Sequence, residues 1–181
     1  EGNFGRFTTN LKTAYIFENY QYFADNSTNQ YTYGKTENLI TKADLGYQLF
    51  KSTQVNGILD YNRTNGYGTG FGNHVREISS ASLLVKQDFS AYWKNEFGIR
   101  KEFTNNYESP VLFSLGSSYQ FNKLYNLKLN VSRNFRIPTF NDLYWETGGN
   151  PDLKPESSYQ AEIGNVFTFK DISLTQTFYY I

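Results

Sequence analysis

The residues best suited to bind a small molecule lie in the segment 134–162, which reads NFRIPTFNDLYWETGGNPDLKPESSYQAE. Two adjacent aromatic residues, Tyr144 and Trp145, precede a glycine pair, and Asn150 follows that pair. The prolines restrict the backbone, so the segment is expected to form a long but rigid loop. An aromatic ring buries a large area and has few torsions to immobilise, so we expect Tyr144 and Trp145 to contact a small-molecule ligand. Asn150, in the same loop, is a third candidate contact.

Other kinds of chemistry have little support in the sequence. His74 is the only histidine, cysteine is absent, and a single histidine in a glycine-rich stretch makes a poor metal site, so we expect a solvated loop residue there. No Ser/His/Asp arrangement and no phosphate-binding glycine motif occurs. The 17 basic residues balance the 17 acidic ones, which gives no argument for nucleic acid as a partner. The sequence therefore predicts neither an enzyme nor a metal site, and no cofactor.

The hydrophobic pattern has a period of two residues, which is typical of β-strands. Between residues 39 and 50 one face is uncharged, while Lys42, Asp44 and Gln48 lie on the other. The uncharged face consists of Leu39, Thr41, Ala43, Leu45, Tyr47 and Leu49. In a membrane barrel the uncharged face contacts lipid, because a charge placed there at the bilayer midplane costs about 2–4 kcal/mol. We expect the charged face to line the lumen.

The same pattern predicts about nine strands. They lie near 5–23, 35–50, 54–64, 76–88, 91–103, 111–121, 126–135, 157–167 and 171–181. Most reach the roughly nine to eleven residues that a tilted strand needs to cross a bilayer core. Short connections alternate with long ones, and the long ones lie near 24–34, 62–75, 104–110 and 136–156. The long loops of outer-membrane barrels are extracellular, so we expect these four to be extracellular. Mean hydropathy of -0.60 suits such a barrel, whose alternating faces keep the average low.

Aromatic residues gather at both ends of the expected strands. One set is at the short turns: Tyr47, Phe50, Phe89, Tyr92, Trp93, Tyr119, Phe121, Tyr125, Phe167 and Phe169. A second set is expected at the opposite ends: Tyr20, Tyr22, Phe23, Phe103, Phe135 and Tyr180. Amphipathic rings prefer the headgroup layer of a membrane, so the two sets predict two aromatic girdles. On this view Tyr144 and Trp145 could belong to the outer girdle instead of a ligand site.

More than one class of protein fits the alternation. A soluble β-sandwich or lipocalin-like barrel also alternates, but with its apolar face inward. A passive outer-membrane porin or an adhesin-type barrel would share the membrane features. Strand length, loop asymmetry and the paired aromatic sets favour an all-β, antiparallel transmembrane β-barrel, of which this chain is a part.

The segment 134–162 also carries a specific resemblance. It is similar to the motif of TonB-dependent outer-membrane receptors, which runs FR-x-PT-x-NELY, a short spacer, GNP-x-LKPE, and then E-x-G in the next strand. The matching residues are Phe135, Arg136, Pro138, Thr139, Asn141, Leu143, Tyr144, Gly149, Asn150, Pro151, Leu153, Lys154, Pro155, Glu156, Glu162 and Gly164. Asp142 stands where glutamate is common, which is a mild departure.

The resemblance implies a barrel of about 22 strands filled by an N-terminal plug domain. It implies that ligand binds from outside, and that the TonB complex of the inner membrane pulls on the plug, powered by the proton gradient. On that basis residues 1–181 are expected to be a barrel segment without the plug, crossing the bacterial outer membrane several times. The expected partners are outer-membrane lipid, the rest of the barrel, the plug, the TonB complex through that plug, and a small-molecule ligand. The short spacer after Tyr144 is like that of cobalamin receptors, and iron-siderophore receptors stay open.

Overall fold

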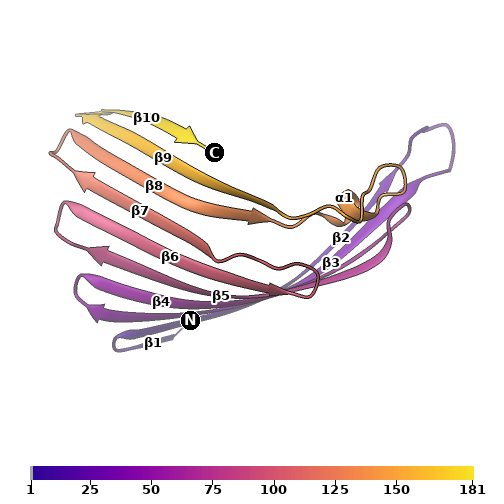
Figure 1. Ribbon diagram of the computed structural model, residues 1–181, viewed down its shortest axis with the longest axis horizontal. Coiled ribbons are helices and arrows are strands. Elements are labelled where there is room, and N and C mark those ends of the chain that lie inside the picture. Colours follow the sequence, from indigo (N-terminus) through magenta and orange to yellow (C-terminus); the bar gives the residue numbers. More distant parts are fainter. Residues whose placement is uncertain (1) are drawn as a thin grey trace.

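A computed structural model describes residues 2–181 as one antiparallel sheet whose ten strands follow chain order (Figure 1). The elements are β1 (Gly2–Phe4), β2 (Phe7–Tyr22), β3 (Thr32–Phe50), β4 (Thr53–Gly68), β5 (Gly72–Asp88), β6 (Trp93–Thr104), β7 (Leu112–Gln120), β8 (Tyr125–Arg136), α1 (Phe140–Tyr144), β9 (Glu156–Phe169) and β10 (Ile172–Tyr180). The all-β antiparallel class is confirmed. Within residues 2–181 no helix is long and apolar enough to span a membrane.

The expected strand count was one too low. The sequence predicted one strand over 5–23, whereas the chain first forms a small hairpin in which Phe4 pairs with Phe7. Gly5 makes this turn possible with a φ of 64°, in the left-handed region that glycine enters at little cost. The residues on both sides of the turn continue the strand pattern, so the reversal was hidden.

The predicted loop over 62–75 is also wrong, because nearly all of it is strand. β4 continues to Gly68 and β5 begins at Gly72, and these two residues face each other across a tight turn. Gly70 and Gly72 adopt φ values of 91° and 73° in this turn. The glycine-rich composition suggested a mobile loop, but in this stretch only Gly70 and Gly72 adopt a positive φ. His74 consequently lies on a strand.

The two faces of the sheet divide as the alternation predicted. Residues opposite one another on neighbouring antiparallel strands share a face, and Ala43 lies opposite Leu59 while Lys42 lies opposite Asp60. Leu39, Thr41, Ala43, Leu45 and Tyr47 therefore share one face, and Lys42, Asp44 and Gln48 share the other. We name these the apolar face and the polar face.

The apolar face is open across the whole sheet. Leu143 is the only large apolar side chain that is buried in residues 2–181. Large side chains exposed on the apolar face include Leu11, Leu45, Leu59, Leu83, Phe97, Ile99, Phe113, Leu115, Leu129, Val131, Ile163, Leu174 and Phe178. A soluble β-sandwich would cover such a face with a second sheet, and the described residues form only one. The described residues therefore form no sandwich by themselves.

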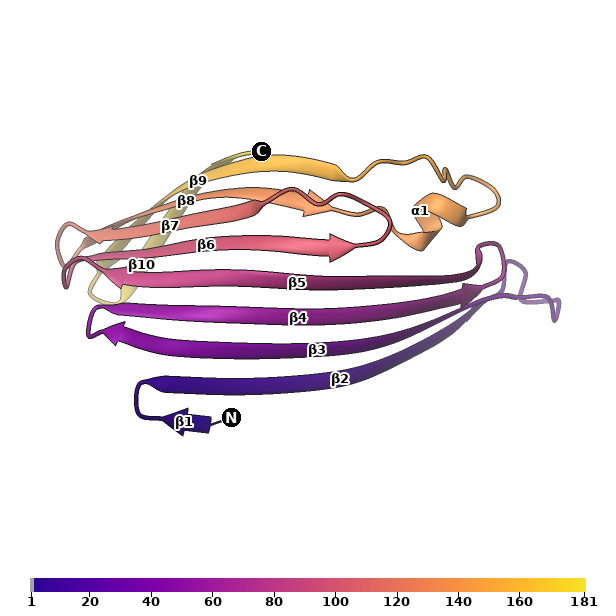
Figure 2. The same cartoon turned by 60° about the horizontal axis from the view of Figure 1, so that its bottom comes forward.

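The polar face is the inner face of the curved sheet. The loop that holds α1 leaves the end of β8 and crosses back toward the ends of β4 and β5 (Figures 1 and 2). There the Phe140 ring lies against Gly66 and under the Arg76 guanidinium. Gly66 and Arg76 belong to the polar face, because Gly66 pairs with Thr36 and Arg76 pairs with Thr64. The loop thus folds into the concave side.

The aromatic set at the short turns forms a continuous row of rings. Neighbouring centroids lie 4.8–6.3 Å apart along the row that joins Phe89, Trp93, Tyr119, Phe121, Tyr125 and Phe167. At the other end the prediction is partly wrong. Tyr20 lies on the polar face beside Gly34, and Tyr180 pairs with Ala161 in the middle of β9. Phe103 and Phe135 do lie on the apolar face near the strand ends.

Candidate functional site

The motif helix α1 begins with a reciprocal cap. Pro138 holds the preceding residue extended, and the Thr139 hydroxyl accepts a hydrogen bond from the Asp142 amide at 3.2 Å. The Asp142 carboxylate accepts one from the Thr139 amide at 2.8 Å in return. This is a capping box in which aspartate replaces the usual longer acid. The departure from glutamate at residue 142 therefore leaves the local structure intact.

Arg136 ties the two ends of the motif loop together. Its guanidinium lies 3.2 Å from the Asp142 carboxylate and 3.4 Å from that of Glu156, the first residue of β9. Both ion pairs are exposed, and exposed pairs each contribute about 0–1 kcal/mol. Their main effect is geometric, since one planar guanidinium sets where the helix and the next strand lie relative to β8.

The turn after α1 is held by backbone contacts. The Gly149 amide donates to the Trp145 carbonyl at 2.6 Å, and a Cβ on Gly149 would lie 2.8 Å from that oxygen. The Asn150 amide donates to the Asp142 carbonyl at 2.9 Å, while its side chain accepts from the Asp152 amide. Leu143 is 1% exposed beneath this turn. The GNP part of the motif thus closes the loop over Leu143.

The remaining motif residues frame this loop. Pro138 is buried, and Leu153, Lys154 and Pro155 form an irregular segment leading into β9. Phe135 lies on the apolar face opposite Ser157. Glu162 lies on the polar face opposite Asn130 and accepts a hydrogen bond from Gln160. Gly164, also on the polar face, lies opposite Lys128.

Side chains of α1 clasp the long β4–β5 hairpin. The Tyr144 ring stacks on the His74 ring, with centroids 3.6 Å apart and an interplanar angle of 8°. The Arg76 guanidinium lies 4.8 Å from the Phe140 centroid, and Gly66 leaves room for that ring. We call Phe140 and Tyr144 with Gly66, His74 and Arg76 the aromatic clasp. His74 was expected to be a solvated loop residue, and this stacking shows that the expectation was wrong.

Trp145 lines a cavity beside the β4–β5 turn. The Glu146 amide donates to the Gly70 carbonyl at 2.7 Å, which fixes Trp145 beside the β4–β5 turn. The Trp145 side chain is 56% exposed and lines a cavity of about 960 Å³. The other aromatic residues of the lining are Tyr20, Tyr22, Tyr31, Tyr33 and Phe71. Sequence reasoning missed these tyrosines, although the pairs at 20–22 and 31–33 flank one long loop.

The three predicted ligand contacts therefore differ in their surroundings. Tyr144 is half-buried against His74, Trp145 is open to the cavity, and Asn150 is exposed but holds a turn. Trp145 is the best placed of the three to meet a ligand. The contact role of all three stays a prediction.

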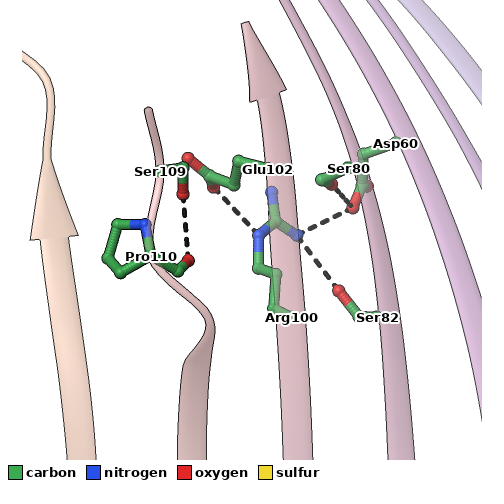
Figure 3. A network of polar contacts seen from close by, with 7 residues as sticks. All are labelled: Asp60, Ser80, Ser82, Arg100, Glu102, Ser109 and Pro110. Atoms are coloured by element: carbon green, nitrogen blue, oxygen red, sulfur yellow. Dashed lines mark hydrogen bonds and ion pairs between the residues drawn. The ribbon is translucent and has the colours of Figure 1, made fainter. Parts of the chain in front are cut away.

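A polar network covers the inner wall below the clasp (Figure 3). The Arg100 guanidinium lies 2.9 Å from the Asp60 carboxylate and 3.0 Å from that of Glu102. The Ser80 hydroxyl donates to the Asp60 carboxylate, and the Ser82 hydroxyl accepts from the Arg100 guanidinium. One cation thus lies between two carboxylates, and polar side chains of this kind suit the water-filled lumen of a membrane barrel. In residues 2–181 no cluster of three or more His, Cys, Asp or Glu side chains could hold a metal ion.

The cap gives a prediction that depends on pH. Hydrogen bonds from Thr139 hold the pKa of Asp142 below its ordinary value of 3.8, so this carboxylate stabilises the loop above that value and ceases to do so as pH falls through its lowered pKa. Asp142→Asn should therefore increase acrylamide quenching of Trp145 fluorescence at pH 7. The difference from the unmodified protein should vanish in strong acid. Trp93→Phe provides the background, since the chain has two tryptophans.

Asp152→Asn is the matched control for this experiment. Its carboxylate forms no hydrogen bond or ion pair in the described part of the chain, so quenching should not change. An equal effect of both substitutions would show that the capping box does not order the loop.

The sheet and its loop resemble part of the wall of a membrane barrel, and comparison with known proteins gives the family. A model of the family described as TonB dependent receptor-like, beta-barrel matches residues 2–181. The chain therefore belongs to the β-barrel family of TonB-dependent receptors, as the motif predicted. This is a family of receptors and transporters rather than enzymes.

Curated relatives of this chain include proteins named vitamin B12 transporter BtuB. The one from Photobacterium profundum is 29% identical over 145 residues, which cover 78% of this chain and 24% of the relative. The one from Vibrio vulnificus is 35% identical over 113 residues, covering 59% of this chain and 18% of the relative. The chain thus spans about a quarter or less of the length of these relatives.

Solved structures share the fold at low sequence identity. The siderophore receptor PirA from Acinetobacter baumannii superposes with a TM-score of 0.85 at 14% identity, covering 98% of this chain and 32% of that one. The ferric enterobactin receptor PfeA superposes with a TM-score of 0.81 at 13% identity, covering 99% and 33%. At such identity these likenesses support the barrel fold and do not indicate a substrate.

Proposed function

We propose that this chain is part of the wall and outer gate of a receptor that imports a scarce nutrient across the bacterial outer membrane. Residues 1–181 would form a barrel segment only, and the remaining strands and the plug would lie elsewhere in the receptor. The plug would link the barrel to the TonB complex, which supplies the energy. A vitamin B12-like cobalamin or an iron-siderophore complex is the proposed ligand, in line with the names of the relatives.

One observation carries the proposal above the others. The family motif folds as a capped and cross-linked loop that lies over the polar face and reaches the β4–β5 hairpin. A loop bound in this way can close the barrel mouth, whereas a passive pore needs an open one. The cavity beside Trp145, with its aromatic lining, gives a large ligand a place to rest at that mouth.

Uptake by the intact receptor tests the proposal. Cells that express it should accumulate radiolabelled cyanocobalamin or a ferric siderophore, and collapse of the proton gradient should stop accumulation while surface binding continues. A receptor without its plug's TonB-binding segment is the matched control and should bind without accumulating. Accumulation that continues without the gradient would instead identify a passive porin.

A further inference from the structure

Charged residues on the apolar face are confined to the end with the long loops. By strand register they are Lys35, Glu37, Arg63, Glu77, Lys101 and Arg133. Both carboxylates have partners in the sheet. Glu77 forms an ion pair with Arg63 at 3.5 Å, and Glu37 accepts a hydrogen bond from Asn65 at 3.4 Å. Lys101 and Arg133 form no ion pair in the part of the chain that the structure describes. This face therefore carries a local excess of positive charge.

The two cations converge on one short segment. Lys101 reaches from β6 and donates to the Ser109 carbonyl, while Arg133 reaches from β8 and lies 3.5 Å from the Val111 carbonyl. These two oxygens belong to residues two positions apart in the segment that leads into β7. The Arg133 guanidinium also lies 5.5 Å from the centroid of the Tyr159 ring, which is 59% exposed.

The height of the pair on the sheet matches a membrane surface. In β6, Lys101 follows the exposed Ile99 on the same face, and in β8 Arg133 follows Val131. The next residues along the same face of each strand are aromatic: Phe103 follows Lys101, and Phe135 follows Arg133. The cations thus lie between the last aliphatic residues and the outer aromatic residues, where headgroups of the adjoining leaflet are expected.

We propose that Lys101 and Arg133 bind the phosphate groups of an anionic lipid in the leaflet next to the long loops, while Ile99, Phe113 and Val131 contact its acyl chains. This inference rests on the proposed function only in placing the apolar face in the outer membrane. Two unpaired cations at the edge of a lipid-facing surface gain most from phosphates at the same depth, and each such cation strengthens binding to an anionic surface. Phosphorylated glycolipid is the expected class, because it presents phosphate and several acyl chains together.

Lipid retention by the intact receptor tests the inference. The receptor is reconstituted in phosphatidylcholine nanodiscs doped with lipid A, and bound lipid is counted by native mass spectrometry after detergent release. K101Q/R133Q should lower lipid A retention about tenfold or more. K101R/R133K, which keeps both charges, should retain lipid A. Saturating inorganic phosphate, which lacks acyl chains, should not displace the lipid.

The matched control is K94Q/K128Q, which removes two cations from the polar face. It should leave lipid A retention unchanged, and both double variants should keep the heat-modifiable band of a folded barrel. Unchanged retention in K101Q/R133Q, equal loss in the control, or displacement by phosphate alone would overturn the inference. Nutrient uptake is measured separately, so a failure of energised uptake leaves the lipid result interpretable.

Discussion

Leu59→Arg should lower the unfolding free energy of the intact receptor by about 2–4 kcal/mol. Leu59 lies on the apolar face in the middle of β4, opposite Ala43 and Ala81, and its side chain is 56% exposed. A guanidinium at this point would enter the hydrocarbon core of the membrane without a partner. Urea unfolding of the receptor in lipid vesicles, followed by the heat-modifiable band, measures the change.

Ile58→Arg is the matched control, one residue earlier in the same strand. Ile58 lies on the polar face opposite Asp44 and Ser82. An arginine there meets water and a nearby carboxylate, so the unfolding free energy should fall by much less. Equal losses for the two variants would mean that the apolar face does not contact lipid. A larger loss for Ile58→Arg would mean that the two faces are assigned the wrong way round.

The division of the faces was predictable because it needs only local information. Side chains alternate along any strand, so Lys42 and Ala43 must lie on opposite faces wherever the strand pairs. Turn positions are less secure, since a reversal is visible only when its residues break the pattern. Gly5 reverses the chain inside a run that still alternates, and the glycines near Gly70 suggested a loop where the strands continue.

In the candidate site, too, local structure was predictable from the sequence and long-range contacts were not. The capping box of Thr139 and Asp142 spans three residues, so motif spacing alone could indicate it. The stacking of Tyr144 on His74 joins residues 70 positions apart, and it depends on how far the α1 loop folds across the sheet. No local sequence pattern indicates how far the α1 loop extends across the sheet. The tyrosines of the cavity were missed for the same reason.

Replacing Tyr144 and Trp145 together with alanine should reduce ligand affinity of the intact receptor by about tenfold or more, since aromatic anchors are each worth roughly 1–2 kcal/mol or more. The structure suggests that the two single variants will differ. Trp145→Ala removes an exposed ring from the cavity and leaves the backbone contacts of the loop in place. Tyr144→Ala removes the partner of His74 and should also loosen the aromatic clasp.

His74→Ala separates these two effects, because it breaks the clasp and leaves both candidate contacts present. If Tyr144 acts as a ligand contact, Tyr144→Ala should weaken binding more than His74→Ala does, as measured by equilibrium binding to whole cells. If the two substitutions weaken binding equally, Tyr144 serves the loop and Trp145 alone remains a candidate contact. Trp93→Ala, in the girdle at the short turns, controls for the loss of a tryptophan from the barrel. Full affinity in the Tyr144 and Trp145 double variant, combined with loss of the heat-modifiable band, would mean that both rings are structural and that neither contacts the ligand.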